Sequence, residues 1–249
     1  MTPSLTPSPH RQVRLVRLLT ELALIEDDWP QREFADRLGQ MFNFADSIIL
    51  ADAHKMKPER GFMAVTDSAD ELKQAVSHAK GKLVQGIIES CSLGTERPKI
   101  RWPALAEDDP ELKYERFHRF YLSHQREQDL ALRALRSSGR EALTGCSPAL
   151  KKLALLDRVL EDTLWDHTAR FLAAVPRLLE RRFDRLRAGE GEARAEPGWL
   201  VQFRKDVQSL LLAELDLRLQ PVLGLVESLE RCTSAQRLRA EAPETGYTN

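Results

Sequence analysis

The chain has 249 residues, enough for one large domain or two small ones with a substantial hydrophobic core. Its 37 lysines and arginines nearly balance 38 aspartates and glutamates, so the overall charge does not point to nucleic acid or to an anionic membrane as a partner. The three cysteines, Cys91, Cys146 and Cys232, are isolated, which argues against a disulfide framework and favours a reducing compartment.

No targeting or membrane segment is predicted. The first residues, MTPSLTPSPHR, lack the apolar run of a signal peptide. The most apolar stretch, Leu210 to Leu229, is interrupted by Glu214, Asp216 and Arg218 and is too polar to span a bilayer. We therefore expect a soluble, cytoplasmic protein.

The N-terminal part of the chain begins with a segment, 1–9, that is rich in Pro, Ser and Thr and is expected to be disordered. A helix is predicted from about 10 to 25, with its leucines and valines facing inward. Arg11, Arg14 and Arg17 recur every three residues on its other side. Such a basic row is usually a solvated face and only sometimes a site for phosphate or for an acidic partner.

Two short helices, predicted at 31–41 and 45–55, have the spacing of a helix-turn-helix motif. The second helix carries Asp46 and Asp52, with no lysine or arginine before Lys55. A phosphate backbone repels such a surface, so simple packing of two helices explains these residues as well as DNA binding does.

A longer helix is predicted at 68–91, where Ser68 and Glu71 form a capping box. Its apolar positions predict a buried face of Leu72, Val76, Leu83 and Ile87. Gly81 and Gly86 lie inside this helix, where each costs about 1 kcal/mol relative to alanine. We interpret these two glycines as sites of close packing.

The segment 92–109 is predicted to be a linker between an N-terminal helical unit, 10–91, and a larger helical bundle, 110–232. The bundle begins with a helix at about 110–137 that has an aromatic face and a basic bias. The aromatic face contains Leu112, Phe117, Phe120 and Tyr121, and the basic residues are Arg116, Arg119, Arg126, Arg133 and Arg136. The tail, 233–249, is expected to be disordered.

The stretch 147–232 predicts two long helices that fold back on each other through a charged turn at 188–196. The first helix has Ser147 as its N-cap, and a kink is expected at Pro176. Its predicted inward stripe is Leu153, Leu156, Leu160, Leu164, His167, Phe171, Val175 and Leu178.

The second helix of this hairpin opens at Pro197 and is expected to bend at Pro221. It is apolar on several sides between Leu210 and Leu229, so it should be central in a bundle or an oligomer. The fold class predicted from these patterns is all-α, a multi-helix bundle dominated by a long, coiled-coil-like antiparallel hairpin at the C-terminus.

No catalytic, cofactor-binding or metal-binding residues are predicted. Glu115 and His118 have the spacing of a di-iron ligand pair, but such sites need a second pair and further glutamates, and neither is found. Glu111 and Lys113 imitate a nuclease motif, but they lie at a helix start, whereas that chemistry sits on strands. The chain has no zinc-like clustering, phosphate-binding loop or nucleophile elbow. We expect a protein that is not an enzyme.

Glu214 is the polar residue on the hairpin seam that most needs an explanation. Folding the hairpin about its turn brings Glu214 opposite Phe171, near His167 and Arg170. We expect Glu214 to form a buried polar pair with His167 or Arg170. Such a pair specifies helix register more reliably than it adds stability, and pairing with His167 would be sensitive to pH.

Four segments carry a family resemblance: Arg14–Leu19, Phe34–Leu38 and, most specifically, Gly198–Phe203 and Leu211–Val222. They resemble an uncharacterised, all-helical family of bacterial proteins found mainly in proteobacteria, a domain of unknown function whose members have about this length. The resemblance covers most of the chain. It supplies no catalytic residue and no cofactor.

Members of that family are associated with neighbouring genes for envelope proteins that resemble stator-type motor subunits. The resemblance therefore implies a cytoplasmic accessory of an envelope stator-like complex, with motor-like subunits as its partners.

Two functions are consistent with these patterns. The first is a non-enzymatic helical scaffold or adaptor that self-associates or docks a partner's helix, with an acidic-partner surface at Arg177, Arg181, Arg182 and Arg185. The alternative is a nucleic-acid-binding regulator that uses the segment 31–55 and the basic helical faces. Salt-sensitive binding to DNA would distinguish them.

Overall fold

The computed structural model describes residues 14–22, 24, 48, 51–52, 55, 68–92, 98–103, 113–188 and 198–241. These ranges contain helices and no strand, which confirms the all-α fold class. The helices are α1 (Arg14–Glu21), α4 (Ser68–Ser90), α5 (Tyr114–Cys146), α6 (Pro148–Ala188) and α7 (Gly198–Glu241). None of them combines the length and the hydrophobicity needed to cross a bilayer.

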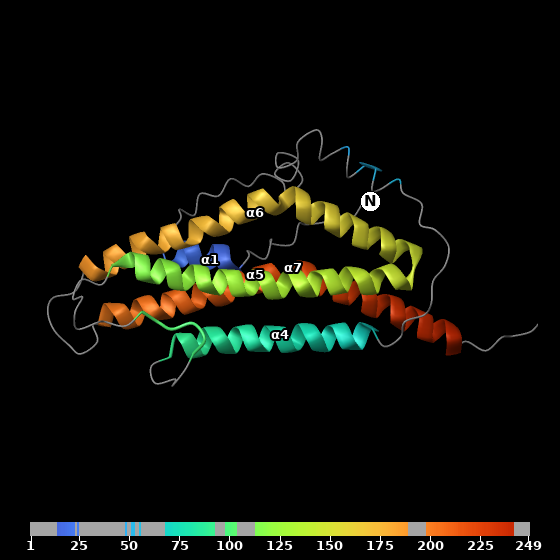
Figure 1. Cartoon of the computed structure of the whole chain (residues 1–249), viewed down its shortest axis with the longest axis horizontal. Coiled ribbons are helices and arrows are strands. Elements are labelled where there is room, and N and C mark those ends of the chain that lie inside the picture. The colour runs from blue at the N-terminus through green and yellow to red at the C-terminus, as the bar shows by residue number, and fades with distance from the viewer. Residues whose placement is uncertain are drawn as a thin grey trace, which may run out of the picture.

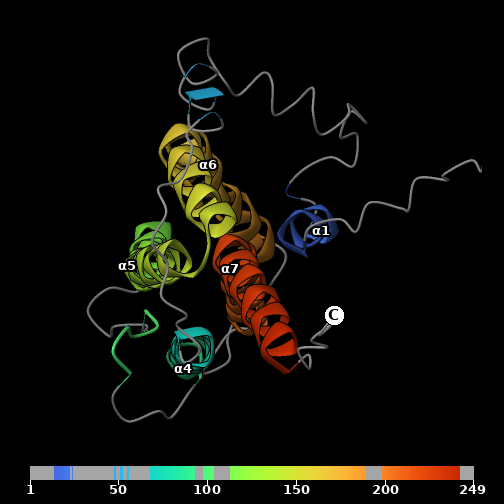
Figure 2. The same ribbon diagram turned by 90° about the vertical axis from the view of Figure 1, so that its right-hand side faces the viewer.

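Helix α7 lies at the centre of the bundle. The end-on view shows α1, α4, α5 and α6 arranged around it (Figure 2), and each of the four packs against it. The reason is visible in the sequence, because α7 is apolar on several sides. Leu210, Leu211, Ala213 and Leu215 are all completely buried, although they point in different directions around the helix.

Helix α5 packs more extensively against α6 and α7 than those two helices pack against each other. Figure 1 shows α6 and α7 running in opposite directions, with α5 alongside both. The core is therefore shared among three long helices. Ser147 joins α5 to α6, and its hydroxyl accepts a hydrogen bond from the backbone N–H of Leu150 at 3.2 Å, as expected of an N-cap.

The inward stripe predicted for α6 is wrong for most of its length. Of the predicted residues, only Val175 is among the buried ones, which are Ala154, Leu172, Val175, Pro176, Leu179 and Phe183. No residue between Ala154 and Leu172 is buried, and Figure 1 shows α6 bowing away from α5 and α7 along its middle.

The physical reason is an ionic seam between α5 and the middle of α6. Asp157 and Glu161 of α6 face Arg136 and Arg140 of α5, with N–O distances of 2.6 to 3.3 Å. Carboxylates thus occupy the side of α6 that faces its neighbour. The predicted leucines lie on the adjoining side of the helix, and Leu156, Leu160 and Leu164 are only half-buried.

Both α5 and α7 are longer than predicted. Helix α7 continues to Glu241, so the expected disorder after Cys232 is wrong for the first part of the tail. Thr233 is buried, and the side-chain amide of Gln236 donates to the carbonyl of Cys146 at 3.5 Å, so this last part of α7 packs near the end of α5. The segments 1–9, 31–41 and 242–249 and most of 45–55 and 188–196 lie outside the described residues.

Aromatic side chains fill one end of the bundle. Phe203 of α7 lies between Phe117 and Phe183, with ring centroids 5.2 and 5.4 Å apart in edge-to-face arrangements. The segment 98–103, which we call the strap, inserts Trp102 against Phe117 and Phe120, each at 5.1 Å. The strap is therefore anchored on α5 by its tryptophan.

The glycines of α4 do not serve close packing, contrary to the sequence interpretation. A Cβ added at Gly81 or Gly86 would meet nothing within 4 Å, whereas one at Gly139 of α5 would lie 3.2 Å from Leu225 Cδ1.

We expect Gly81→Ala and Gly86→Ala each to raise the free energy of unfolding by about 0.5–1 kcal/mol, measured by urea denaturation. Gly139→Ala should give no such gain. A loss of stability in Gly81→Ala would contradict the open environment of this glycine.

Candidate functional site

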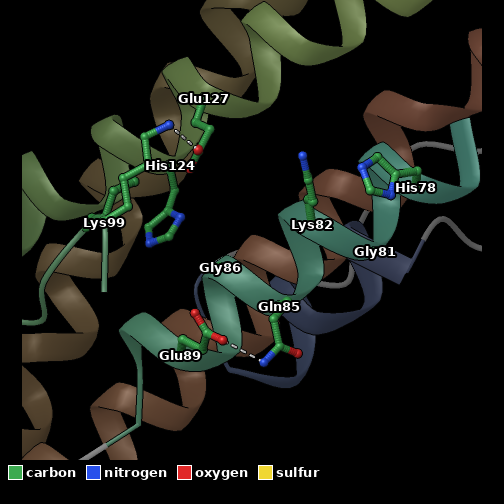
Figure 3. Close-up of a pocket in the computed structure, with 10 residues that line it drawn as sticks. His78, Gly81, Lys82, Gln85, Gly86, Glu89, Lys99, His124 and Glu127 are labelled. Carbon is green, nitrogen blue, oxygen red and sulfur yellow. Dashed lines mark hydrogen bonds and ion pairs between the residues drawn. The ribbon is translucent and has the colours of Figure 1, made fainter. Parts of the chain in front are cut away.

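A groove with a volume of about 500 Å³, lined mainly by polar residues, lies between α4 and α5. We call it the α4–α5 groove (Figure 3). Helix α4 contributes His78, Gly81, Lys82, Gln85, Gly86 and Glu89. Helix α5 contributes His124 and Glu127, and the strap contributes Lys99 and Ile100.

The spacing of the α4 residues explains why they share the groove. His78, Lys82, Gln85 and Glu89 recur at three and four residues and therefore lie along one side of the helix. The other side of α4 carries the predicted apolar residues Leu72, Val76, Leu83 and Ile87, all of which are buried. Burial of that apolar side turns the polar and glycine side toward the groove.

His124 lies at the inner end of the groove and is only 2% exposed. Its Nε2 atom is 2.9 Å from the hydroxyl of Ser90, which is also buried and donates to the carbonyl of Ile87 at 2.9 Å. Burial lowers the pKa of His124 to about 4, and the nearby carboxylate of Glu127 opposes this shift only in part. The ring is therefore neutral at neutral pH.

This buried histidine predicts a dependence of stability on pH. An unfolded histidine has a pKa of about 6.5, so as pH falls below that value the unfolded chain takes up a proton that the folded chain does not. Stability should fall between about pH 6.5 and 4, by about 3 kcal/mol, and level off below the folded pKa. Denaturation curves of the wild type and of His124→Gln across this range measure the difference. Parallel pH profiles for the two proteins would contradict the prediction.

The charged residues of the groove are unequally paired. The ammonium of Lys99 lies 2.6 Å from the carboxylate of Glu127, which ties the strap to α5. The amide of Gln85 donates to Glu89 at 2.7 Å. Within the described part of the chain, Lys82 and His78 form no ion pair or hydrogen bond through their side chains. The end of the groove near Lys82 is therefore the more positive one.

The Ser90–His124 contact lacks the other parts of a nucleophilic site. Ser90 is 1% exposed, and its neighbour Cys91 is buried with its thiol pKa raised to about 11 by that burial, so neither side chain is presented as a nucleophile. Among the described residues, no cluster of three or more histidine, cysteine, aspartate or glutamate side chains has a metal-binding arrangement. The ring of His118 stacks on Tyr114, with centroids 6.0 Å apart.

Glu214 is completely buried, but its partners differ from the predicted ones. Its carboxylate accepts hydrogen bonds from the Tyr121 hydroxyl at 3.0 Å and the Gln125 amide at 2.9 Å, and it pairs with Arg218 at 2.8 Å. We call these residues the Glu214 network. The side chains that donate to Glu214 from another helix come from α5, and the Gln125 amide also donates to the carbonyl of Leu172 of α6 at 3.1 Å.

His167 is half-buried, and the guanidinium of Arg170 donates to the carbonyl of Asp166 at 3.2 Å. Neither side chain reaches Glu214. Within the network, burial together with the adjacent Glu214 carboxylate raises the pKa of Tyr121 well above its ordinary value, so its hydroxyl stays protonated and donates.

The four arginines predicted as an acidic-partner surface occupy different environments. Arg182 pairs with the nearly buried Asp206 at 2.8 Å and so links α6 to α7. Arg185 donates to the carbonyl of Leu22 at 3.4 Å, beside α1. Arg177 and Arg181 are exposed. Of the four arginines, only Arg177 and Arg181 therefore take no part in the contacts that hold the helices together.

Four of the basic residues invoked for nucleic-acid binding are paired with acids. Arg14 pairs with Asp216 at 2.7 Å, and Arg17 lies 3.4 Å from Glu21. On α5, Arg133 pairs with Asp129 at 3.1 Å, and Arg136 belongs to the ionic seam. The segment 31–55 lies almost entirely outside the described residues, so the helix-turn-helix interpretation stays a prediction.

The fold and the groove define a helical bundle protein with a central helix and a polar surface cavity. Comparison of the sequence with known families identifies the family of the chain. The chain belongs to the family described as protein of unknown function, DUF3348, whose profile matches residues 1–231. No curated protein and no solved structure shows a significant match.

Proposed function

We propose that the protein is a non-enzymatic helical scaffold that docks a helix of a partner protein on α6. The observation that carries this proposal is the displaced apolar stripe of α6. Leu156, Leu160, Leu164 and Phe171, which we call the α6 apolar row, are half-buried or exposed. The ionic seam with α5 takes their expected place on the inner side.

The spacing of this row suits a helical partner. Its members recur at four and seven residues, which places them along one line of α6, as in a helix that packs against another helix. Phe171 is 37% exposed, unusual for a phenylalanine inside a long helix. A row of large apolar side chains outside the core supports a docking surface.

The charges beside the row suggest the chemistry of the partner. Helical spacing places Arg170, Arg177 and Arg181 along the neighbouring side of α6. Glu180 and Asp184 are close in sequence, yet neither forms an ion pair with Arg177 or Arg181 in the described chain. An amphipathic helix with acidic residues flanking its apolar side is the complementary partner.

The family resemblance points to envelope motor-like subunits as the source of that helix. On this proposal the protein is a cytoplasmic accessory of an envelope stator-like complex. Self-association through the same row is the other arrangement that a scaffold of this kind permits. Light scattering coupled to size-exclusion chromatography distinguishes the two arrangements, because only self-association increases the mass of the purified protein.

The proposal is tested by a mild-detergent pull-down from the native host, with and without nuclease, read by mass spectrometry. Three proteins are compared: the wild type, the double variant Leu160→Glu/Leu164→Glu, and Leu130→Glu as a control. Leu130 is a leucine of α5 that is 72% exposed and lies outside the row. Circular dichroism confirms that all three are folded.

We expect the wild type and the control to retain the same partners in both nuclease conditions, and the double variant to lose them. If the double variant retained the same partners, the α6 apolar row would not be their docking surface. Partners that vanish with nuclease would favour the nucleic-acid alternative.

A further inference from the structure

Two glycines of α4, Gly81 and Gly86, line the α4–α5 groove, and the packing of α4 against its neighbours does not require them. Gly81 and Gly86 lie in the interior of α4, where glycine is the least favourable residue after proline. Neither glycine is required by a close neighbour, because nothing lies within 4 Å of a Cβ added at either position. The backbone of α4 is therefore open at each glycine, and a flat group could lie directly against it at Gly86.

The two ends of the groove differ in charge. Lys82 and His78 stand one helical turn apart at one end without partners among the described residues. Glu89 and His124 stand at the other end, and Figure 3 shows Lys99 and Glu127 paired beside His124. Lys82 and Glu89 are seven positions apart, which corresponds to about 10 Å along the axis of α4.

The inner end offers hydrogen-bond acceptors. One oxygen of Glu89 is bonded to Gln85, which leaves the other oxygen available to a ligand. The single hydroxyl hydrogen of Ser90 is directed to the carbonyl of Ile87, so an Nε2–H of His124 completes the contact between the two side chains. The second ring nitrogen of His124, Nδ1, is then an acceptor on a side chain that lines the groove.

We propose that the α4–α5 groove binds a nucleoside monophosphate, with its phosphate at Lys82 and His78 and its base over the backbone at Gly86. An exocyclic amino group on the base donates to Glu89 and His124. The length of the ligand matches that of the groove. Its negative phosphate matches the positive end of the groove, and the amino group of its base is a donor for the acceptors at the other end. The volume of about 500 Å³ lies within the usual range of small-molecule pockets.

The full-length protein tests this by calorimetric titration with AMP, CMP and UMP, and with inorganic phosphate and adenosine as separate arms. We expect AMP and CMP to bind, and UMP, which lacks the amino group, to bind more weakly. Phosphate alone and adenosine alone should each bind more weakly than AMP. If inorganic phosphate bound as tightly as AMP, the base would contribute nothing to binding, and the proposal would be overturned.

Two variants locate the site. Lys82→Met should weaken binding of AMP about tenfold, since a charge-assisted hydrogen bond is lost. Gly86→Leu should abolish binding by filling the groove while the helix content is unchanged. Lys205→Met, which removes an exposed lysine of α7, is the matched control and should bind as the wild type does. Absence of binding by AMP and CMP, or binding that neither Lys82→Met nor Gly86→Leu changes, would overturn the proposal.

Discussion

Replacing Glu214 by alanine is expected to lower the free energy of unfolding by about 3–5 kcal/mol. The carboxylate is completely buried, and its removal leaves the guanidinium of Arg218 with only the more distant carboxylate of Asp129, at 3.5 Å, in place of its 2.8 Å partner. The Tyr121 hydroxyl and the Gln125 amide lose acceptors in a place that water does not reach. Urea or guanidinium denaturation of the two proteins measures the change.

Two further variants separate charge from shape at this position. Glu214→Gln keeps the size of the side chain and should cost less than Glu214→Ala. Glu227→Ala removes an exposed partner of Arg231 and should change stability by about 0.5 kcal/mol or less. If Glu214→Leu were as stable as the wild type, with the same oligomeric state, the Glu214 network would neither stabilise the bundle nor specify its register.

Phe203→Ala should have an effect of similar size, a loss of about 3–5 kcal/mol in the free energy of unfolding. The ring is completely buried and packs on Phe117, Phe183 and Trp102, with centroids between 5.2 and 6.4 Å away. Its removal leaves a cavity that three rings cannot close without leaving their favoured geometry.

Phe171→Ala is the matched control for this second substitution. It removes the same side chain from a long helix, but Phe171 is 37% exposed and lies outside the core. We expect a loss of about 1 kcal/mol or less for this control in the isolated protein. Equal losses for the two variants would show that the aromatic end of the bundle is not part of the stable core. Thermal denaturation with denaturant titration gives both values.

The positions of the described helices were largely predictable from the sequence, and the central place of α7 was predictable as well. A helix that is apolar on several sides has to be covered on several sides, and Leu210 to Leu229 met that condition. The inner face of α6 was not predictable. Its leucines and the acids Asp157 and Glu161 both recur at helical spacing, so periodicity indicates two candidate faces but does not say which one meets α5.

The groove was missed, although part of its signal was present. His124 and Gln128 continue the line of Phe117 and Tyr121 at helical spacing, so the sequence contained polar residues on a predicted core face. The partner helix was the missing information. Ser90 meets His124 only because α4 packs against α5, a contact between residues 34 positions apart that local patterns do not contain.

The ionic seam makes the middle of α6 respond to solution conditions differently from its ends. Near α5 the seam consists of ion pairs, together with the guanidinium of Arg133 over the ring of Trp165 at 3.8 Å. Added salt weakens such contacts more than it weakens the apolar packing that holds Val175 and Leu179. The helix is thus fastened at both ends and adjustable between them. Amide hydrogens in that central stretch should exchange with solvent earlier than those of α7, and ionic strength sets how often it opens.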